Sequence, residues 1–225
     1  MEYVHDCELI GRSAELQQIE QYLQPTLDKR SRRKVFLVHG SGGIGKTQLA
    51  VEFARRYQND YSAIFFLDGS TKDHFQPSLL RCADRIHDRQ NARDTAVRSN
   101  AVTDTQAKAK GVLQWLSLPD NWRWLLVIDD YNRELSCSNR DEQRFDPEQA
   151  MPYADHGSIL ITSRLSTLRN SHGSLHLGPV SDEEAGMILT SRADLCTQDQ
   201  QGQFTHLVCR DRGRLLTLAL QTSMD

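Results

Sequence analysis

The amino-acid sequence predicts an α/β fold: a three-layer αβα domain with a parallel five-stranded sheet, followed by a small all-helical subdomain. Two observations lead to this prediction. Five short apolar runs alternate with segments whose apolar residues recur at helical spacing, which is typical of a parallel sheet. After about residue 179 this alternation stops and only helical patterns continue. The length of 225 residues fits one sizeable domain with a smaller appendage.

The first predicted elements are a short helix and a buried strand. Apolar residues recur at helical spacing over residues 14–23, directly after Ser13, which can cap a helix. The basic run over residues 28–34 indicates a solvated surface loop; a phosphate or nuclear-import patch is the less favoured alternative. An apolar strand is predicted next, at residues 35–38.

The other strands are predicted at the remaining apolar runs, residues 63–67, 124–128, 159–161 and 175–177. Most of these runs are continuous, as in strands covered on both faces. Apolar stripes predict helices over residues 49–57, 79–86 and 112–116. Two segments, residues 88–104 and 132–152, are polar without periodicity, and we expect surface excursions there.

The domain boundary is predicted near Pro179, which separates a nucleotide-binding domain over residues 1–179 from a helical subdomain over residues 180–225. The subdomain begins at a capping box, Ser181-Asp-Glu-Glu184, in which the serine and the glutamate three residues later satisfy the first turn. Two further helices are predicted, around residues 204–208 and 215–220.

Composition excludes several classes of protein. The net charge is -3 and the pI about 6.2, so the basic excess expected of a nucleic-acid-binding surface is missing and we expect no such partner. The longest apolar stretches fall far short of the roughly 18 residues that a membrane span needs, so we expect none. Five scattered cysteines indicate reduced thiols and a cytoplasmic location.

The strongest chemical signal is the string Gly40-Ser-Gly-Gly-Ile-Gly-Lys-Thr47, a complete GxxxxGK[ST] phosphate loop between an apolar strand and an amphipathic helix. Its glycines let successive backbone amides point inward, and the following helix adds its positive end. Lys46 is expected to reach the β- and γ-phosphates, and Thr47 to offer its hydroxyl to Mg²⁺. The residues expected to contact the nucleotide here are Gly40, Gly42, Gly43, Ile44, Gly45, Lys46, Thr47 and Gln48.

The second anchor of the metal is expected at Asp129, which ends the apolar run of residues 124–128. An isolated Asp-Asp pair is usually a strand-ending turn, but the complete phosphate loop favours the metal site here. Asp130 is a candidate for orienting or deprotonating the attacking water, with a plain loop acid as the alternative. Arg164, just past the run of residues 159–161, is a candidate sensor of the γ-phosphate.

Several motifs in the right order resemble the NB-ARC domain of STAND-class P-loop NTPases, the switch modules of plant and fungal NOD-like immune receptors and of apoptosome-forming proteins. The motifs are the phosphate loop, Leu125-Leu-Val-Ile-Asp-Asp130, Ile159-Leu-Ile-Thr-Ser-Arg164, Leu177-Gly-Pro-Val-Ser-Asp-Glu-Glu-Ala185 and Leu216-Thr-Leu-Ala-Leu220. The resemblance runs from about residue 8 to the C-terminus.

The resemblance implies roles that spacing alone does not show. In relatives the segment similar to residues 8–24 covers the nucleotide base, which implies adenine contacts from Ile10 and Arg12. The arginine that matches Arg164 senses the γ-phosphate. A base contact is also implied at Leu216 and Thr217, although the family has proline where this chain has Thr217. The implied ligand is ADP at rest and ATP in the active state, with Mg²⁺.

The function that the resemblance implies is an ADP/ATP-operated signalling switch with slow hydrolysis as its reset. Relatives continue into a winged-helix subdomain that follows the matched region, so we expect a shortened or minimal receptor core, monomeric with ADP, that self-associates only as part of an activated full-length protein. The alternatives are an AAA+-like ATPase with steady turnover, a small-molecule kinase, and a pseudo-enzyme that only binds partners.

Overall fold

The computed structural model describes residues 9–25, 32–91, 105–131, 152, 154–166 and 173–197. Its centre is a five-stranded sheet with the strand order β2-β3-β4-β1-β5. Every neighbouring pair of strands is parallel. The strands are β1 (Lys34–His39), β2 (Ala63–Asp68), β3 (Trp124–Asp129), β4 (Ser158–Ser163) and β5 (Gly173–His176).

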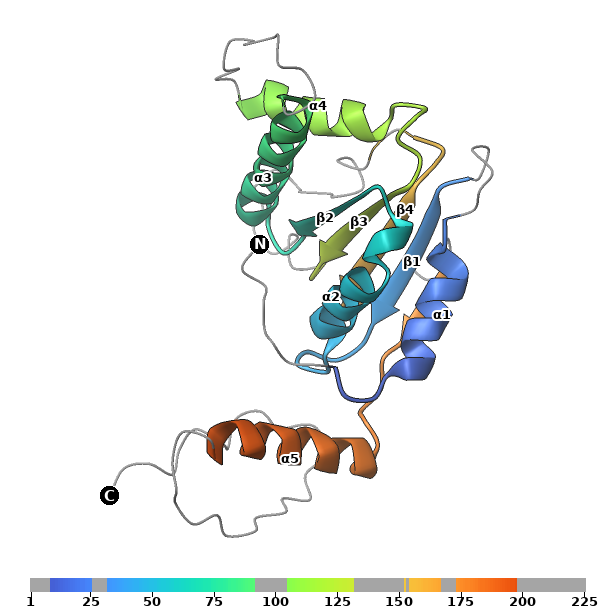
Figure 1. Ribbon diagram of the computed structural model, residues 1–225, viewed down its shortest axis with the longest axis vertical. Coiled ribbons are helices and arrows are strands. Elements are labelled where there is room, and N and C mark those ends of the chain that lie inside the picture. Colours follow the sequence, from blue (N-terminus) through green and yellow to red (C-terminus); the bar gives the residue numbers. More distant parts are fainter. Residues whose placement is uncertain are drawn as a thin grey trace, which may run out of the picture.

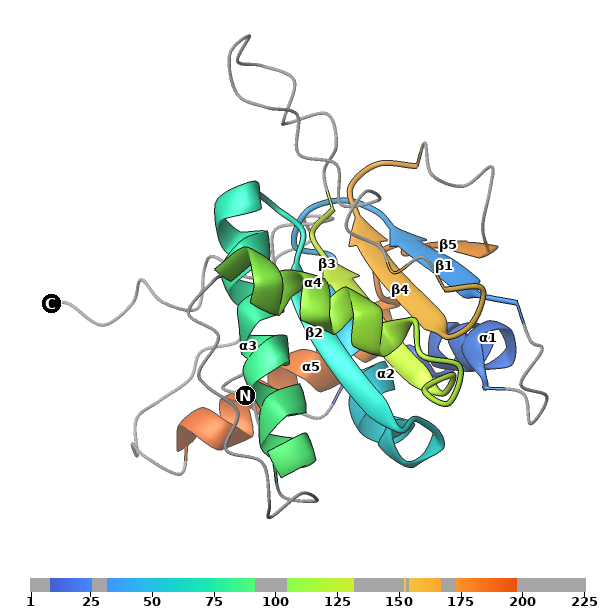
Figure 2. The ribbon, with the colours of Figure 1, turned by 90° about the horizontal axis from the view of Figure 1, so that it is seen from above.

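Helices cover both faces of the sheet (Figure 1; Figure 2). The covering helices are α1 (Ser13–Leu23), α2 (Lys46–Arg56), α3 (Lys72–Asn91) and α4 (Thr105–Leu116). A short 3₁₀ turn η1 (Gln58–Asp60) follows α2, and α5 (Asp182–Thr197) lies apart from the layers. The pair α1 and α2 packs on one face, around Leu16, Leu49 and Val127. The pair α3 and α4 packs on the other face, around Leu79 and Leu116. The three-layer α/β prediction is therefore confirmed.

All five predicted strands are present, each within two or three residues of the expected bounds. The continuous apolar runs predicted strands covered on both faces, and β1, β3 and β4 are buried along almost their whole length. The predicted helices over residues 14–23 and 112–116 correspond to α1 and α4. The two helices predicted after residue 200 lie outside the described residues.

One expectation for the loops is wrong. The polar segment of residues 88–104 was expected to lie outside regular structure, but α3 continues through Asn91. A polar stretch without an apolar stripe can continue a helix whose earlier turns are anchored, here by Phe75 and Leu79 in the core. Residues 92–104 and 132–151 lie outside the described part of the chain.

The sheet brings its functional positions to one edge. In a parallel sheet the carboxyl ends of all strands lie on the same side, and ligands bind there in open α/β folds. β1, β3 and β4 are adjacent, with Val127 opposite Leu160 and Leu37 opposite Ile161. The residues that follow these strands therefore meet at the start of α2.

Candidate phosphate-binding site

The loop from Gly40 to Gly45 joins β1 directly to α2, and its backbone needs glycine at more than one position. Gly45 precedes the first residue of α2 with φ 98°, in the left-handed region that favours glycine. At Gly40 a side chain has no room, because an added Cβ would lie 2.5 Å from the carbonyl oxygen of Leu177. The loop thus curls tightly in front of a helix N-terminus, the arrangement that binds anions.

Lys46 is the first residue of α2 and only 8% exposed. Its Nζ donates to the carbonyl oxygens of Gly40, at 3.0 Å, and Ser41, at 2.8 Å. Burial lowers the pKa of Lys46 and the nearby Arg164 lowers it further, whereas Asp130 and Asp129 raise it. A cation desolvated in this way inside the loop gains from a phosphate oxygen more than a surface lysine would.

Thr47, the next residue of α2, lies against the end of β3. Its hydroxyl donates to both carboxylate oxygens of Asp129, at 2.9 and 3.0 Å. Hydroxyl and carboxylate oxygens are the donors that Mg²⁺ prefers, and Mg²⁺ at nucleotides takes one or two protein ligands plus phosphate oxygens and water. The pair therefore fits the expected metal. Among the described residues, His, Cys, Asp and Glu form no group of three that could hold a metal without such help.

Thr162 on β4 holds the Asp129 carboxylate from its other side, and sequence reasoning missed it. Its hydroxyl donates to Asp129 Oδ1 at 2.5 Å and accepts the backbone N–H of Asp130 at 2.9 Å. Asp130 itself has φ 53°, so the chain turns sharply after Asp129. The signal was available in the sequence, since Thr162 directly follows the apolar run of residues 159–161.

Gly69, after β2, is a second residue that sequence reasoning missed. Its N–H donates to the carbonyl oxygen of Asp129 at 2.7 Å. An added Cβ at Gly69 would lie 2.8 Å from Cγ2 of Ile128 and 3.1 Å from the same carbonyl oxygen. The β2–α3 turn therefore packs against the backbone of Asp129 and fixes its position.

Arg164 follows β4, where its guanidinium lies across the phosphate loop. The guanidinium carbon would be 3.6 Å from a Cβ added at Gly42, and Nε is 3.8 Å from Asp130 Oδ1. Both side chains are open to solvent, with Arg164 57% exposed. The structure thus brings Arg164 and Asp130 to the same loop as Lys46, where each could reach a bound phosphate.

The remaining residues predicted to contact the nucleotide differ in how far they are buried. Gln48 lies in the first turn of α2, exposed and close to Gly45, and Ile44 packs against the core under α2. Ile10 is half-buried. Arg12 is 7% exposed, and its guanidinium donates to the carbonyl oxygen of Gly178 at 2.6 Å. The base contacts of Ile10 and Arg12 and the nucleotide contacts of Ile44 and Gln48 remain predictions. Leu216 and Thr217 lie outside the described part of the chain.

The comparison with protein families decides the assignment, because the AAA ATPase domain matches residues 8–215. The chain belongs to the AAA ATPase domain family. This AAA ATPase domain is similar in structure to Cdc6p from Pyrobaculum aerophilum, with a TM-score of 0.53 and 16% sequence identity over 86% of this chain and 52% of that one. At that identity the likeness shows the fold alone.

Two curated relatives of this AAA ATPase domain come from a fungus and a plant. A nucleotide-binding leucine-rich repeat (NLR)-like protein of Hyaloscypha variabilis is 26% identical over 69% of the chain and 15% of the relative. The putative disease resistance protein RGA4 of Solanum bulbocastanum is 27% identical over 81% of the chain and 17% of the relative. They support the NB-ARC-type module that the motifs predict, and the chain spans about one sixth of their length. Within the described residues, no helix is long and apolar enough to cross a membrane.

Proposed function

We propose that the chain is an ADP- and ATP-binding switch module of a signalling protein of the NOD-like receptor type. The observation that carries this proposal is the coupled arrangement of Lys46 inside the phosphate loop and of Thr47 against Asp129. The disease resistance protein and the NLR-like protein among its relatives support the signalling role. In this proposal the ADP form is the resting state and ATP drives the rearrangement.

The residues divide the recognition of the phosphates between them. The loop amides and the N-terminus of α2 attract the anion, and Lys46 can exchange the carbonyl oxygens of Gly40 and Ser41 for phosphate oxygens. Thr47 and Asp129 would hold Mg²⁺, which would neutralise part of the phosphate charge. Arg164, which lies over Gly42, is the residue we assign to the third phosphate of ATP.

The distinction between ADP and ATP then follows from Arg164 and Asp130. They face each other at 3.8 Å, both open to solvent, so a third phosphate near the loop can draw the guanidinium away from the carboxylate. Released from Arg164, Asp130 can orient a water molecule. In this proposal hydrolysis is slow, and the site acts as a switch.

The experiment that tests the proposal is to denature the purified protein and identify the released nucleotide by chromatography. We expect ADP at about one molecule per chain, and none from a Lys46→Ala variant, because the charged loop contact is lost. Lys34→Ala, which removes a lysine from the opposite edge of the sheet, is the matched control and should retain ADP. A guanine nucleotide, or a wild-type protein that binds no nucleotide when ADP is added, contradicts the proposal.

The second candidate function is steady ATP turnover, which the AAA ATPase domain match favours. The two functions differ in rate and in occupancy. A switch retains ADP through purification and releases phosphate slowly, whereas an ATPase with steady turnover is isolated empty and hydrolyses ATP over many cycles. Phosphate release measured over hours with excess ATP separates them, and an Asp130→Asn variant shows whether the carboxylate contributes to the rate.

A further inference from the structure

Glu184, in the first turn of α5, has a role beyond capping its own helix. Its carboxylate Oε2 accepts the backbone N–H of Ser181 at 2.9 Å and the Ser181 hydroxyl at 3.0 Å, the capping box that the sequence predicts. Its other oxygen, Oε1, lies against Gly11, in the space that a Cβ at that residue would fill. Gly11 has φ 76°, in the left-handed region that favours glycine.

Arg12 forms the second half of this junction. It has φ 61°, a left-handed conformation that is uncommon for a residue other than glycine and marks a position fixed by its surroundings. Its buried guanidinium donates to Gly178 O at 2.6 Å and to Glu15 Oε1 at 2.8 Å. Hydrogen bonds from Ser181, and to a smaller extent from the Arg12 backbone, keep the pKa of Glu184 below its usual value.

Gly178 is one residue away from a contact with the phosphate loop. The preceding residue, Leu177, is buried and donates its N–H to the carbonyl oxygen of His39 at 2.8 Å. The Leu177 carbonyl oxygen packs against Gly40, at a position that leaves no room for a Cβ. A continuous series of contacts therefore leads from Glu184 through Gly11, Arg12, Gly178 and Leu177 to the loop.

The position of α5 gives this series of contacts its significance. Figure 1 shows α5 set apart from the three layers and joined to them near its first turn, next to the segment that enters α1. Further along α5, Met187 is 56% exposed and Leu189 46% exposed. The orientation of α5 relative to the sheet thus depends strongly on the junction at its N-terminus.

We propose that Glu184 is a positioning residue that couples the orientation of α5 to the phosphate loop through Gly11, Arg12 and Gly178. The inference rests on the proposed function, since it concerns how tightly the same loop retains ADP. A change at the junction shifts Gly178, then the Leu177 carbonyl, and with it Gly40, whose carbonyl oxygen accepts from Lys46. Changes in such coupling residues alter affinities about three- to thirtyfold.

The test measures the dissociation of a fluorescent ADP analogue from the full chain. Glu184→Ala should accelerate release by roughly three- to thirtyfold. Ser181→Ala removes the serine side of the same capping box but keeps the carboxylate beside Gly11, so its release should stay within about twofold of wild type. Glu184→Gln, which keeps the length and one acceptor oxygen, should restore most of the wild-type rate. The exposed neighbour Glu183→Ala is the second control.

Hydrogen exchange measured without nucleotide provides a readout that is independent of binding. In Glu184→Ala the amides of residues 11 and 12 should exchange faster, whereas the amides of β3 should be unchanged. If wild type binds ADP but Glu184→Ala releases it at the wild-type rate, or at the same rate as Ser181→Ala, the coupling is wrong and the proposed function stands. If wild type does not bind ADP, the proposed function itself is wrong.

Discussion

The sheet has one edge formed by the carboxyl ends of its strands and an opposite edge formed by their amino ends. Each edge carries a lysine that donates to backbone carbonyl oxygens, yet only the carboxyl edge has the features of an anion site. At the carboxyl edge Lys46 donates to Gly40 and Ser41. At the opposite edge Lys34 donates to the carbonyl oxygen of Gln24 at 2.7 Å. Burial lowers the pKa of both lysines. Charge and desolvation therefore do not distinguish the two edges.

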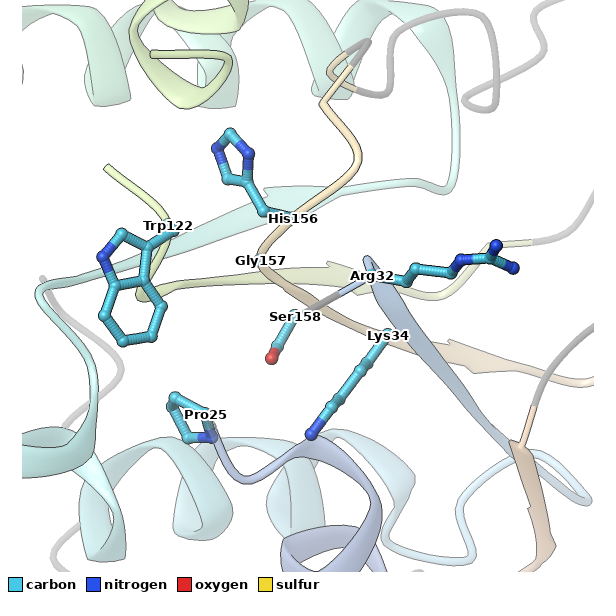
Figure 3. A pocket seen from close by; sticks show the side chains of 7 residues that line it. All are labelled: Pro25, Arg32, Lys34, Trp122, His156, Gly157 and Ser158. Atoms are coloured by element: carbon cyan, nitrogen blue, oxygen red, sulfur yellow. The ribbon is translucent and has the colours of Figure 1, made fainter. Parts of the chain in front are cut away.

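The difference lies in the helix end that each lysine meets. Lys46 begins α2, so the positive end of the helix dipole adds to its charge and attracts an anion. Gln24 is the C-terminal cap of α1, so Lys34 neutralises the negative end of a helix dipole instead. Figure 3 shows the Lys34 side chain directed toward Pro25 at the end of α1, with Trp122 and His156 across the hollow. A lysine marks a phosphate site only when the backbone around it also presents donors.

The largest expected effect is on the free energy of unfolding, and it arises at the amino ends of the strands, opposite the phosphate loop. Gly157 precedes β4 with φ 86°, and a Cβ there would overlap the ring of the fully buried Trp124. Gly157→Ala should lower the free energy of unfolding by about 2–5 kcal/mol, from left-handed strain and overpacking together. Urea unfolding followed by circular dichroism measures this loss.

The matched control for Gly157 is Gly111, which lies exposed on α4 with nothing near its missing Cβ. Gly111→Ala should stabilise the protein by about 0.5–1 kcal/mol. For the comparison of the two edges, Gly157→Ala should keep the wild-type affinity for ADP at temperatures where it is folded. A large loss of affinity would show that the two edges are not independent.

The second effect is on nucleotide binding. Lys46→Ala should weaken ADP binding by roughly tenfold to a hundredfold, because a charge-assisted contact of about 1.5–3 kcal/mol is lost. Lys34→Ala should change the dissociation constant by less than about twofold, since the Lys34 charge interacts with the C-terminal end of α1 and not with the nucleotide. Isothermal titration calorimetry on both variants makes the comparison direct. Equal losses in the two variants would mean that net charge, and not the loop, binds the nucleotide.

A third effect separates the metal contact from the phosphate contact. Thr162→Val removes the hydroxyl that holds Asp129 Oδ1, and loss of a hydrogen bond to a metal-binding carboxylate weakens metal binding about tenfold. The variant should therefore need about tenfold more Mg²⁺ for full ADP affinity, which titration of Mg²⁺ at constant ADP measures. Ser62→Ala, at the opposite end of β2, serves as the control. Unchanged Mg²⁺ dependence in Thr162→Val would show that the Thr162 hydroxyl does not support metal binding by Asp129.

The smallest effect is a dependence of ADP affinity on pH. The pKa of Lys46 lies below its ordinary value of 10.5, and the phosphates bind the charged form. Affinity is therefore complete below this lowered pKa and declines as the pH rises through it, by about twofold where half of the lysine is neutral. Lys46→Arg should bind ADP without this decline, since arginine stays charged, whereas Lys34→Ala should retain it. Fluorescence titrations between pH 7 and 10 provide the measurement.

The sequence alone predicted the strands, the phosphate loop and Asp129, because each is marked by a short run of consecutive residues. Apolar runs identified every strand, and the string from Gly40 to Thr47 identified the loop together with the start of α2. Asp129 was predicted because it ends a strand. Each of these signals occupies fewer than ten consecutive residues.

The residues that were missed act through register between distant segments. Thr162 reaches Asp129 only because β3 and β4 are neighbours, and Gly69 reaches it only because β2 lies on the other side of β3. The contact of Arg12 with Gly178 joins residues far apart in the sequence. Spacing along the chain contains no information on which strands become neighbours, so these contacts required the structure.

The strand order has a consequence for how the protein forms during synthesis. Both neighbours of β1, β4 and β5, lie more than a hundred residues later in the sequence. At a translation rate of about 5–20 residues per second, β1 and the glycine loop emerge from the ribosome roughly six seconds or more before β4 can pair with them. During that interval both edges of an apolar strand are open, so a chaperone that shields extended segments would act chiefly on residues 34–39.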